Sequence, residues 1–414
     1  MVADPGPRVV TTADPGSRAG GTGDDSAGDG AHVRAEAVID LDAVEHNVRT
    51  LLAVARTGNP AVELMAVVKA DGYGHGAVQV ARAARRAGAL ALGLATPAEA
   101  VALVTAGLEC SAERPVLAWL WVPDEDIRPA VQAGVQLVVS SARHLLAVLA
   151  VAATAPGGRP DIHLKIDSGL GRNGAVPADF AGLVADAARA EATGRVRVVG
   201  VMSHLACADV PGDESVPAQV RVFSDGLAMA AAAGLTVRWR HLANTPGTLA
   251  WPDTRYDLVR CGIGLYGVSP FEGADPAADG LRPVMTLRAR VALTKRVPAG
   301  AGVSYGLTYR TAAETTLALV PLGYADGIPR TAGPDAAVWL AGRRRPIAGR
   351  IAMDQFVVDC GDDPVAVGDE VVVFGSGPGQ PTAADWAAAC GTIGYEIVTR
   401  VGPRVPRRYV GFRS

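Results

Sequence analysis

Eight short apolar runs recur between residues 60 and 265, and alanine-rich stretches of helical composition separate them. A β-strand that is buried on both faces is apolar at nearly every position, and such strands are typical of parallel sheets covered by helices. Eight strand–helix units favour a closed, eight-stranded α/β barrel of the TIM type; an open, doubly wound sheet is the competing topology. The eight runs are LMAVVK, ALGLA, PVLAWLW, QLVVS, IHLKID, VVGVMSH, WRHLAN and DLVRCG.

The pattern changes near residue 280, and this change predicts a second domain. VMTLRARVALTKRV, TTLALVPLGY and DEVVVFG are β-type runs that Gly and Pro interrupt, with few helical stretches between them. We expect a barrel domain over residues 35–280 and a C-terminal, mostly antiparallel β domain over residues 281–414. A further strand near residues 37–41 could pair with the distant β domain, and the sequence alone does not decide this.

Composition narrows the class of protein. Residues 1–34 are rich in Gly, Asp, Pro and Ser and lack the apolar segment of a signal peptide, so we expect a disordered tail there. A net charge of −3 gives no electrostatic reason to bind nucleic acid or an anionic membrane. No apolar run reaches the roughly 18 residues of a membrane span. The five cysteines form no C-x-x-C pair, so we expect a cytoplasmic protein with neither a disulfide framework nor a metal centre.

Polar side chains gather at the predicted ends of the barrel strands, where the active sites of such barrels lie. Lys69 ends the first run, and a lysine that leaves an apolar strand loses hydration, which favours its neutral, nucleophilic amine. The loops after the last two runs offer a hydroxyl and glycine-flanked backbone N–H groups, which can bind a phosphate. Pyridoxal phosphate (PLP) requires both features, an amine for its aldehyde and an anchor for its phosphate. The loop residues are Asn244, Thr245, Gly262 and Ile263.

Nine stretches, in order along the chain, resemble the alanine racemase family. They are AVVKADGYGHG, KIDSGLGRNG, MSHLACAD, HLANTPG, LVRCGIGLYG, VSYGLTY, LGYADG, GRIAMDQ and TIGYE, and the resemblance extends from about residue 38 to residue 409. It implies an eight-stranded α/β barrel followed by a β domain. It also implies a PLP-dependent homodimer with shared active sites that interconverts L- and D-alanine and supplies D-alanine for cell-wall peptidoglycan.

The resemblance implies specific roles at the reacting centre. Lys69 would bind PLP and then act as the base on one face of the substrate Cα. Tyr305, from the partner subunit, would be the base on the opposite face. Arg260 would face the pyridine nitrogen, and His204 would link Arg260 to the tyrosine. Because an arginine can only donate, the nitrogen would stay unprotonated, which favours return of the proton to Cα over transamination.

Further residues would surround this centre in the resemblance. Arg172 would bind the substrate carboxylate or the side of PLP that carries the phenolic oxygen, and the backbone of Met353 would lie near the substrate carboxylate. Lys165 is similar to the position that carries a carbamate in many members, where it orients Arg172. The other cofactor-binding positions would be Tyr73, Asn244, Thr245, Gly262, Ile263 and Tyr395. Residues that would line the path of the substrate into the site are Asp209, Tyr324 and Arg350.

Simpler interpretations stay open for single residues and for the function. Lys69 could be a surface lysine beside a turn, Tyr305 a sheet-packing aromatic, His204 a core histidine and Arg172 a solvated loop residue. A racemase acting on serine or lysine, a PLP-dependent decarboxylase with the same barrel and a non-catalytic PLP carrier are the rival functions. The β domain with VSYGLTY and GRIAMDQ argues against the last two, and pocket size decides the substrate.

Overall fold

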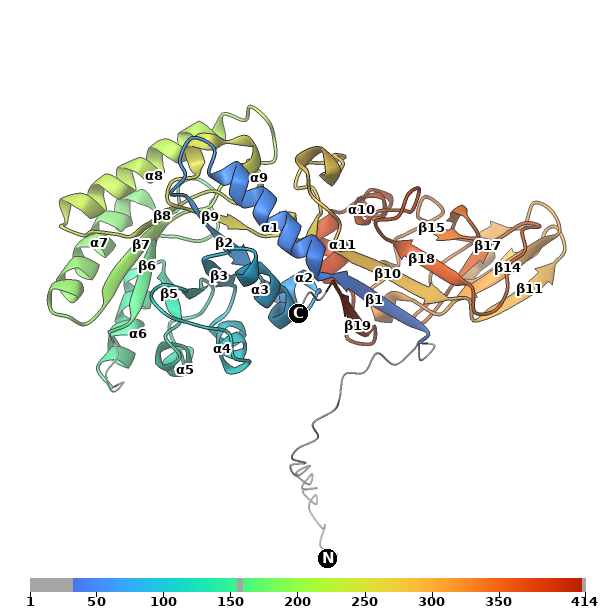
Figure 1. Cartoon of the computed structure of the whole chain (residues 1–414), viewed down its shortest axis with the longest axis horizontal. Helices are drawn as coiled ribbons and strands as arrows, with labels where there is room; N and C mark the ends of the chain where they lie inside the picture. The colour runs from blue at the N-terminus through green and yellow to red at the C-terminus, as the bar shows by residue number, and fades with distance from the viewer. Residues whose placement is uncertain (1–32, 155–158, 412–414) are drawn as a thin grey trace, which may run out of the picture. The chain divides into compact units, whose positions relative to one another are not determined.

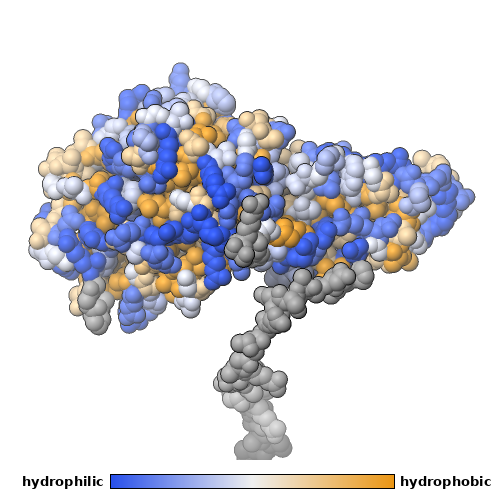
Figure 2. Space-filling view, in the orientation of Figure 1, coloured by the Kyte–Doolittle hydropathy of each residue, from blue (hydrophilic) through white to orange (hydrophobic). Residues whose placement is uncertain are grey.

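The computed structural model describes residues 33–154 and 159–411 (Figure 1). The disordered tail that we expect over residues 1–34 lies outside the described residues, apart from its last two positions. Among the described helices, none is both long enough and apolar enough to cross a membrane. Figure 2 shows hydrophilic side chains interspersed with hydrophobic ones over the visible face of the molecule.

The eight apolar runs all form strands of one parallel sheet, in the spatial order β8-β7-β6-β5-β4-β3-β2-β9. The two end strands approach each other and nearly close a barrel. There the N–H of Asp257 donates to the carbonyl of Arg240 at 3.1 Å, and the N–H of Arg260 donates to that of Ala243 at 3.0 Å. The strands are β2 Glu63–Val67, β3 Ala91–Leu94, β4 Val116–Ala118, β5 Gln136–Val139, β6 Asp161–Lys165, β7 Arg197–Met202, β8 Trp239–His241 and β9 Leu258–Cys261.

Helices follow the barrel strands and cover the outside of the sheet (Figure 1). Local sequence explains where several begin. Thr96 and Glu99 form a reciprocal capping box at the start of α4, with Pro97 as its first residue. The helices are α1 Leu41–Ala55, α3 Ala77–Arg86, α4 Pro97–Thr105, α5 Arg128–Gln132, α6 Ala142–Ala152, α7 Pro177–Ala192, α8 Ser215–Ala232 and α9 Thr245–Ala250, and α2 Lys69–Tyr73 is a short segment whose backbone is left-handed after Lys69.

The C-terminal part of the chain is a mostly antiparallel β structure, which confirms the predicted fold class. A six-stranded sheet has the order β16-β15-β18-β10-β1-β19, and smaller sheets have the orders β11-β14-β17 and β12-β13. The strands are β10 Met285–Arg290, β11 Leu293–Val297, β12 Gly302–Val303, β13 Tyr309–Arg310, β14 Thr315–Val320, β15 Ala337–Leu340, β16 Arg343–Pro346, β17 Phe356–Asp359, β18 Glu370–Phe374 and β19 Arg407–Val410; α10 Ala383–Cys390 and α11 Gly394–Thr399 lie between the last two.

The first strand of the described chain, β1 Ala35–Asp40, belongs to this six-stranded sheet. Its residues are alternately buried and half-buried, as expected for a strand with one face in the core. Val38 lies opposite Thr286 in an antiparallel pair with β10 and opposite Arg408 in a parallel pair with β19. The strand near residues 37–41 therefore pairs with the distant β domain, which the sequence alone did not decide.

Candidate functional site

Lys69 lies directly after β2 at the carboxyl end of the barrel and opens an unusual turn. The five residues that follow it all have positive φ, between 52° and 80°. For L-residues this left-handed conformation costs about 1–2 kcal/mol each. Such strain concentrates at functional sites, where the surrounding structure imposes it. The residues are Ala70, Asp71, Gly72, Tyr73 and Gly74.

Side chains from distant elements hold this left-handed turn. Glu99 accepts a hydrogen bond from the N–H of Ala70 at 2.7 Å. Its other carboxylate oxygen accepts two more from residues 95 and 96, both at 3.0 Å. Within the turn, Asp71 accepts from the N–H of Ala77 at 2.8 Å. Tyr266 donates its hydroxyl to the carbonyl of Val67 at 3.0 Å. The direction of Lys69 is therefore fixed by its neighbours.

A cavity of about 660 Å³ opens at the carboxyl ends of the barrel strands. Two arginines and two lysines line it, and among its described lining residues there is no Asp or Glu. A cavity with this charge balance favours anionic ligands. Eleven residues predicted from the sequence meet here: Lys69, Tyr73, Lys165, Arg172, His204, Asn244, Thr245, Arg260, Gly262, Ile263 and Tyr395.

The two amines in the cavity lose protons more readily than ordinary lysines. Burial lowers the pKa of Lys69, and the charge of Arg172 lowers it further against the opposing effect of Glu99. Burial, followed by the charges of Arg260 and Arg172, lowers the pKa of Lys165 to about 7. Both effects disfavour the ammonium form. Both amines thus favour the neutral, nucleophilic form more than an ordinary lysine does, and for Lys165 this form is populated near neutral pH.

Arg260 projects from β9 into the barrel and is 4% exposed. Its guanidinium donates to the carbonyls of His241 at 2.8 Å, Ser203 at 2.7 Å and Leu242 at 3.1 Å. The Nη2 atom also lies 3.2 Å from Nδ1 of His204. Burial lowers the pKa of Arg260 to about 10, so the group stays charged at neutral pH. Burial and the Arg260 charge lower the pKa of His204 well below its usual value, so this imidazole is neutral.

A cradle of donors lies across the cavity at the ends of β8 and β9. Asn244 caps α9 by accepting from the N–H of Gly247 at 3.0 Å, which places Thr245 at the start of the helix. The Thr245 hydroxyl accepts from the N–H of Gly262 at 3.1 Å. A Cβ at Gly262 would clash with the Tyr73 hydroxyl, so only glycine allows this close approach.

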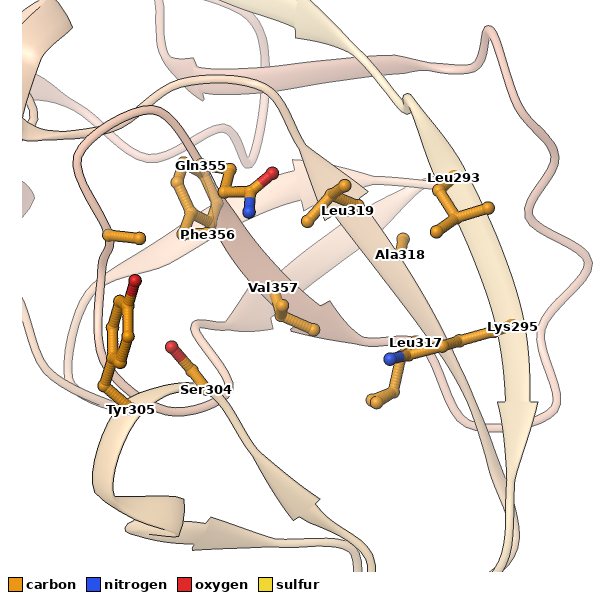
Figure 3. Close-up of a pocket in the computed structure, with 11 residues that line it drawn as sticks. Leu293, Lys295, Ser304, Tyr305, Leu317, Ala318, Leu319, Gln355, Phe356 and Val357 are labelled. Atoms are coloured by element: carbon orange, nitrogen blue, oxygen red, sulfur yellow. The ribbon is translucent and has the colours of Figure 1, made fainter.

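Five predicted residues do not line this cavity. Tyr305, Met353 and Tyr324 are 70%, 53% and 39% exposed, respectively. Tyr305 begins a short 3-10 turn, Tyr305–Leu307, and lines a separate pocket of about 360 Å³ in the β domain. Figure 3 shows Tyr305 and Ser304 on one side of that pocket and Leu293 and Lys295 on the other. One chain alone therefore does not bring Tyr305 to Lys69. The other two such residues are Asp209 and Arg350.

Three of these residues, with Tyr305, form a group in the β domain. The N–H groups of Tyr324 and Ala325 donate to the carbonyls of residues 352 and 353, at 3.1 and 2.9 Å. The Ser304 hydroxyl donates to the carbonyl of Arg350 at 2.6 Å. We call Tyr305, Tyr324, Arg350 and Met353 the β-domain group.

Sequence reasoning missed several residues that shape the site. Trp119, Trp121, His144 and Asn173 line the cavity, and Glu99 braces the turn after Lys69. Two of them, Trp119 and Trp121, lie just past β4, in the run PVLAWLW, so position at a strand end was a usable signal. Glu99 lies 29 residues beyond its partner Ala70, and no local pattern links the two.

Comparison with known proteins assigns both parts of the chain to one family. The family described as "Alanine racemase, N-terminal domain" matches residues 39–270, and "Alanine racemase, C-terminal domain" matches residues 284–409. A protein of Salinispora arenicola named alanine racemase is 54% identical over 92% of this chain and 99% of its own length. The relative from Streptomyces coelicolor with the same name is 54% identical over 92% of this chain and 97% of its own.

A solved structure agrees with this assignment. The crystal structure of alanine racemase from D-cycloserine-producing Streptomyces lavendulae superposes with a TM-score of 0.88 at 53% identity. It covers 92% of this chain and 98% of the other. The chain belongs to the alanine racemase family.

Proposed function

We propose that this protein interconverts L- and D-alanine with PLP bound at Lys69. The observation that carries the proposal is the meeting, in one cationic cavity, of an amine with a lowered pKa and a donor cradle. The relatives named alanine racemase, at 54% identity over nearly their whole length, support the same activity. The D-alanine would supply peptidoglycan, and we place the reaction in the cytoplasm of a homodimeric enzyme.

The residues of the cavity fit PLP. The hydroxyls of Tyr73 and Thr245 and the backbone around Gly262 would hold its phosphate. The absence of a Cβ at Gly262 leaves space beside the Tyr73 hydroxyl, where a larger residue would clash. Lys69 would hold its aldehyde, and Arg260 would face its ring nitrogen. When bound to an amino acid, PLP withdraws electrons from Cα and so makes the α-proton acidic.

The protein's own side chains would then move that proton. Lys69, whose lowered pKa favours the neutral amine, would take or return the proton on one face of Cα. Tyr305 of a second copy of the chain would act on the opposite face, so that the configuration inverts. Arg172 would bind the substrate carboxylate, with the Met353 backbone nearby, and the walls of the cavity would exclude water around the reacting carbon.

Arg260 would set the outcome of the reaction. Its guanidinium is buried and charged, and three backbone carbonyls hold it in place. It can donate a hydrogen bond to the pyridine nitrogen, but unlike a carboxylate it cannot stabilise a proton on that nitrogen. The nitrogen would stay unprotonated, and the proton would return to Cα. Replacing Arg260 with Glu should therefore raise the transamination rate relative to racemisation.

Lys165 would carry a carbamate in the working enzyme. Its amine attacks CO2, a C–N bond forms, and a proton leaves to solvent. A pKa of about 7 leaves much of the amine neutral for this step at physiological pH. The new negative charge would face Arg172 and Arg260 and offset the excess of cations. A carbamate resonance from protein equilibrated with ¹³C-bicarbonate, lost in Lys165→Met, tests this role.

The experiment for the proposed function compares substrates. Purified protein with added PLP should form D-alanine from L-alanine, and turnover with serine and with lysine should be slower. The bulky Trp119, Trp121 and Tyr395 side chains that line the cavity favour a small substrate. Faster turnover of serine or lysine would overturn the substrate assignment, and no turnover of any amino acid would overturn the activity.

A further inference from the structure

A row of polar side chains, buried except at its Asp161 end, crosses the interior of the barrel below the cavity. Gln136 and Asp161 are the first residues of β5 and β6, at the amino ends of the strands. His163, two residues along β6, and His241 on β8 lie between them and Arg260. We call Asp161, Gln136, His163 and His241 the polar chain; the two histidines are 1% and 0% exposed.

The contacts along the polar chain form an unbroken series from Asp161 to Arg260. Gln136 donates to Asp161 at 3.2 Å, and its carbonyl oxygen lies 2.8 Å from Nε2 of His163. Nδ1 of His163 lies 2.9 Å from Nε2 of His241. Nδ1 of His241 lies 3.4 Å from Nη1 of Arg260. The chain therefore connects Arg260 with a carboxylate at the opposite end of the barrel.

The two ends of the polar chain fix the direction of its hydrogen bonds, because the Asp161 carboxylate only accepts and the Arg260 guanidinium only donates. Asp161 is paired with Arg197 through two contacts of 2.6 Å, so it is an acceptor only, and Gln136 must turn its NH2 group toward it. The amide oxygen of Gln136 must then accept from Nε2–H of His163. Nδ1 of His163 is left to accept from Nε2–H of His241. The ring of His241 therefore presents a lone pair, not an N–H, to Arg260.

The surroundings keep both imidazoles neutral, as this arrangement requires. Burial and Arg260 lower the pKa of His163 to about 3. Burial, His163, Arg260 and Lys165 lower the pKa of His241 well below its usual value. The charged groups that face the polar chain are thus Arg260 and Lys165 at one end and Asp161 with Arg197 at the other.

The barrel makes room for the polar chain at one glycine. Gly200, on β7, faces the ring of His163, and a Cβ there would clash with Nδ1 of that ring. Most interior positions of such a barrel hold bulky branched residues that fill the core. Here a side chain is absent so that a histidine can lie across the interior.

We propose that Asp161, which only accepts, and Arg260, which only donates, hold the polar chain in one direction from its two ends, so that His241 accepts from Arg260 and positions it. In the reversed direction His241 would present Nδ1–H to the guanidinium, and two donors would face each other. Arg260 would then lose a side-chain partner and shift from the place where the proposed function needs it. This inference rests on the proposed function only for the role of Arg260 toward the cofactor.

The test is the tautomer of two histidines in the full-length holoprotein. The chain has seven histidines, so ¹⁵N-histidine labelling gives few signals, and the His163→Asn and His241→Asn variants assign the two. We expect both His163 and His241 to be neutral and protonated at Nε2 from pH 6 to pH 9. Protonation of either ring at Nδ1 in the wild type would overturn the proposal without any further variant.

Two variants test the role of the carboxylate. Asp161→Asn can donate to Gln136, and Gln136→Met removes the acceptor for His163, so in each variant only Arg260 opposes the reversed direction. In each variant a fraction of His241 should become protonated at Nδ1, which the wild type does not show, and PLP binding should weaken by up to about tenfold, the loss of one hydrogen bond to a charged group. Arg197→Gln, which breaks the ion pair and keeps the carboxylate, should leave tautomers and PLP affinity unchanged.

Retention of the wild-type tautomers and PLP affinity in Asp161→Asn or in Gln136→Met would contradict the proposal. The tautomer measurement does not depend on racemisation. A protein with the expected tautomers that turns over no amino acid would count against the proposed function and support the polar chain.

Discussion

The ionisation of Lys165 shows how burial controls chemistry at a single residue. The side chain is 5% exposed and faces two arginines and a second lysine inside the barrel. Its folded pKa of about 7 lies far below the ordinary lysine value near 10.4. Between these two values the unfolded chain binds a proton that the folded chain does not, so folding becomes more favourable as the pH rises through this range.

Lys165→Met should therefore stabilise the protein most at low pH. Below about pH 7 the wild type carries the full cost of a buried ammonium, and this cost disappears as the pH approaches 10.5. Urea unfolding of the PLP-free protein, in buffer free of CO2, measures the free energy of unfolding of both proteins at several pH values. A difference between wild type and variant that does not change with pH would contradict the lowered pKa.

At the scale of elements, the strands were predictable and the connections between distant elements were not. All eight apolar runs became barrel strands, because burial on both faces leaves a continuous apolar signal. Since their carboxyl ends meet at one mouth, eleven predicted residues line one cavity. In contrast, β1 pairs with strands some 250 and 370 residues away. The alternation of its side chains predicts a strand with one buried face, but not which strands it pairs with.

The turn after Lys69 and the polar chain also escaped prediction, for physical reasons. Ala70 and Tyr73 adopt left-handed backbone that their residue types do not signal, because tertiary contacts impose it. His163 lies within an apolar run, and only the fold shows that its ring meets His241. Both features depend on partners that are remote in sequence.

Glu99 provides a test of the brace on the left-handed turn. Glu99→Ala removes the acceptor for three N–H groups, so it should lower the free energy of unfolding by about 1.5–3 kcal/mol and weaken PLP binding. Glu99→Gln keeps one acceptor oxygen and should have an intermediate effect. Glu109→Ala, at an exposed surface pair, is the control and should change stability by less than about 0.5 kcal/mol. Equal effects of Glu99→Ala and Glu109→Ala would rule out the brace.

At the scale of the whole molecule, the β-domain group does not line the barrel cavity of its own chain. Tyr305 is 70% exposed, and its neighbours Tyr324, Arg350 and Met353 lie with it outside the barrel cavity. A two-base reaction at Lys69 therefore requires the β-domain group of a second chain. A symmetric dimer would supply one such group to each barrel.

Mixing two inactive variants tests this sharing. Lys69→Ala and Tyr305→Ala should each lack activity alone, and a mixed dimer should contain one site with both residues intact. With free exchange of subunits half of the dimers are mixed, so activity should recover to about a quarter of the wild-type value. The doubly substituted chain mixed with wild type is the control, because every mixed dimer then lacks an intact site. No recovery after verified exchange would place both residues in one chain.

The measurement that tests the central claim most directly follows the Lys69 amine itself. Protein saturated with PLP is reduced with borohydride, digested and analysed by mass spectrometry, while D-alanine formation from L-alanine is assayed in parallel. We expect the reduced cofactor on Lys69, active untreated enzyme, and neither labelling at residue 69 nor turnover in Lys69→Ala. Labelling at another lysine, or racemisation by Lys69→Ala at the wild-type rate, would contradict the account.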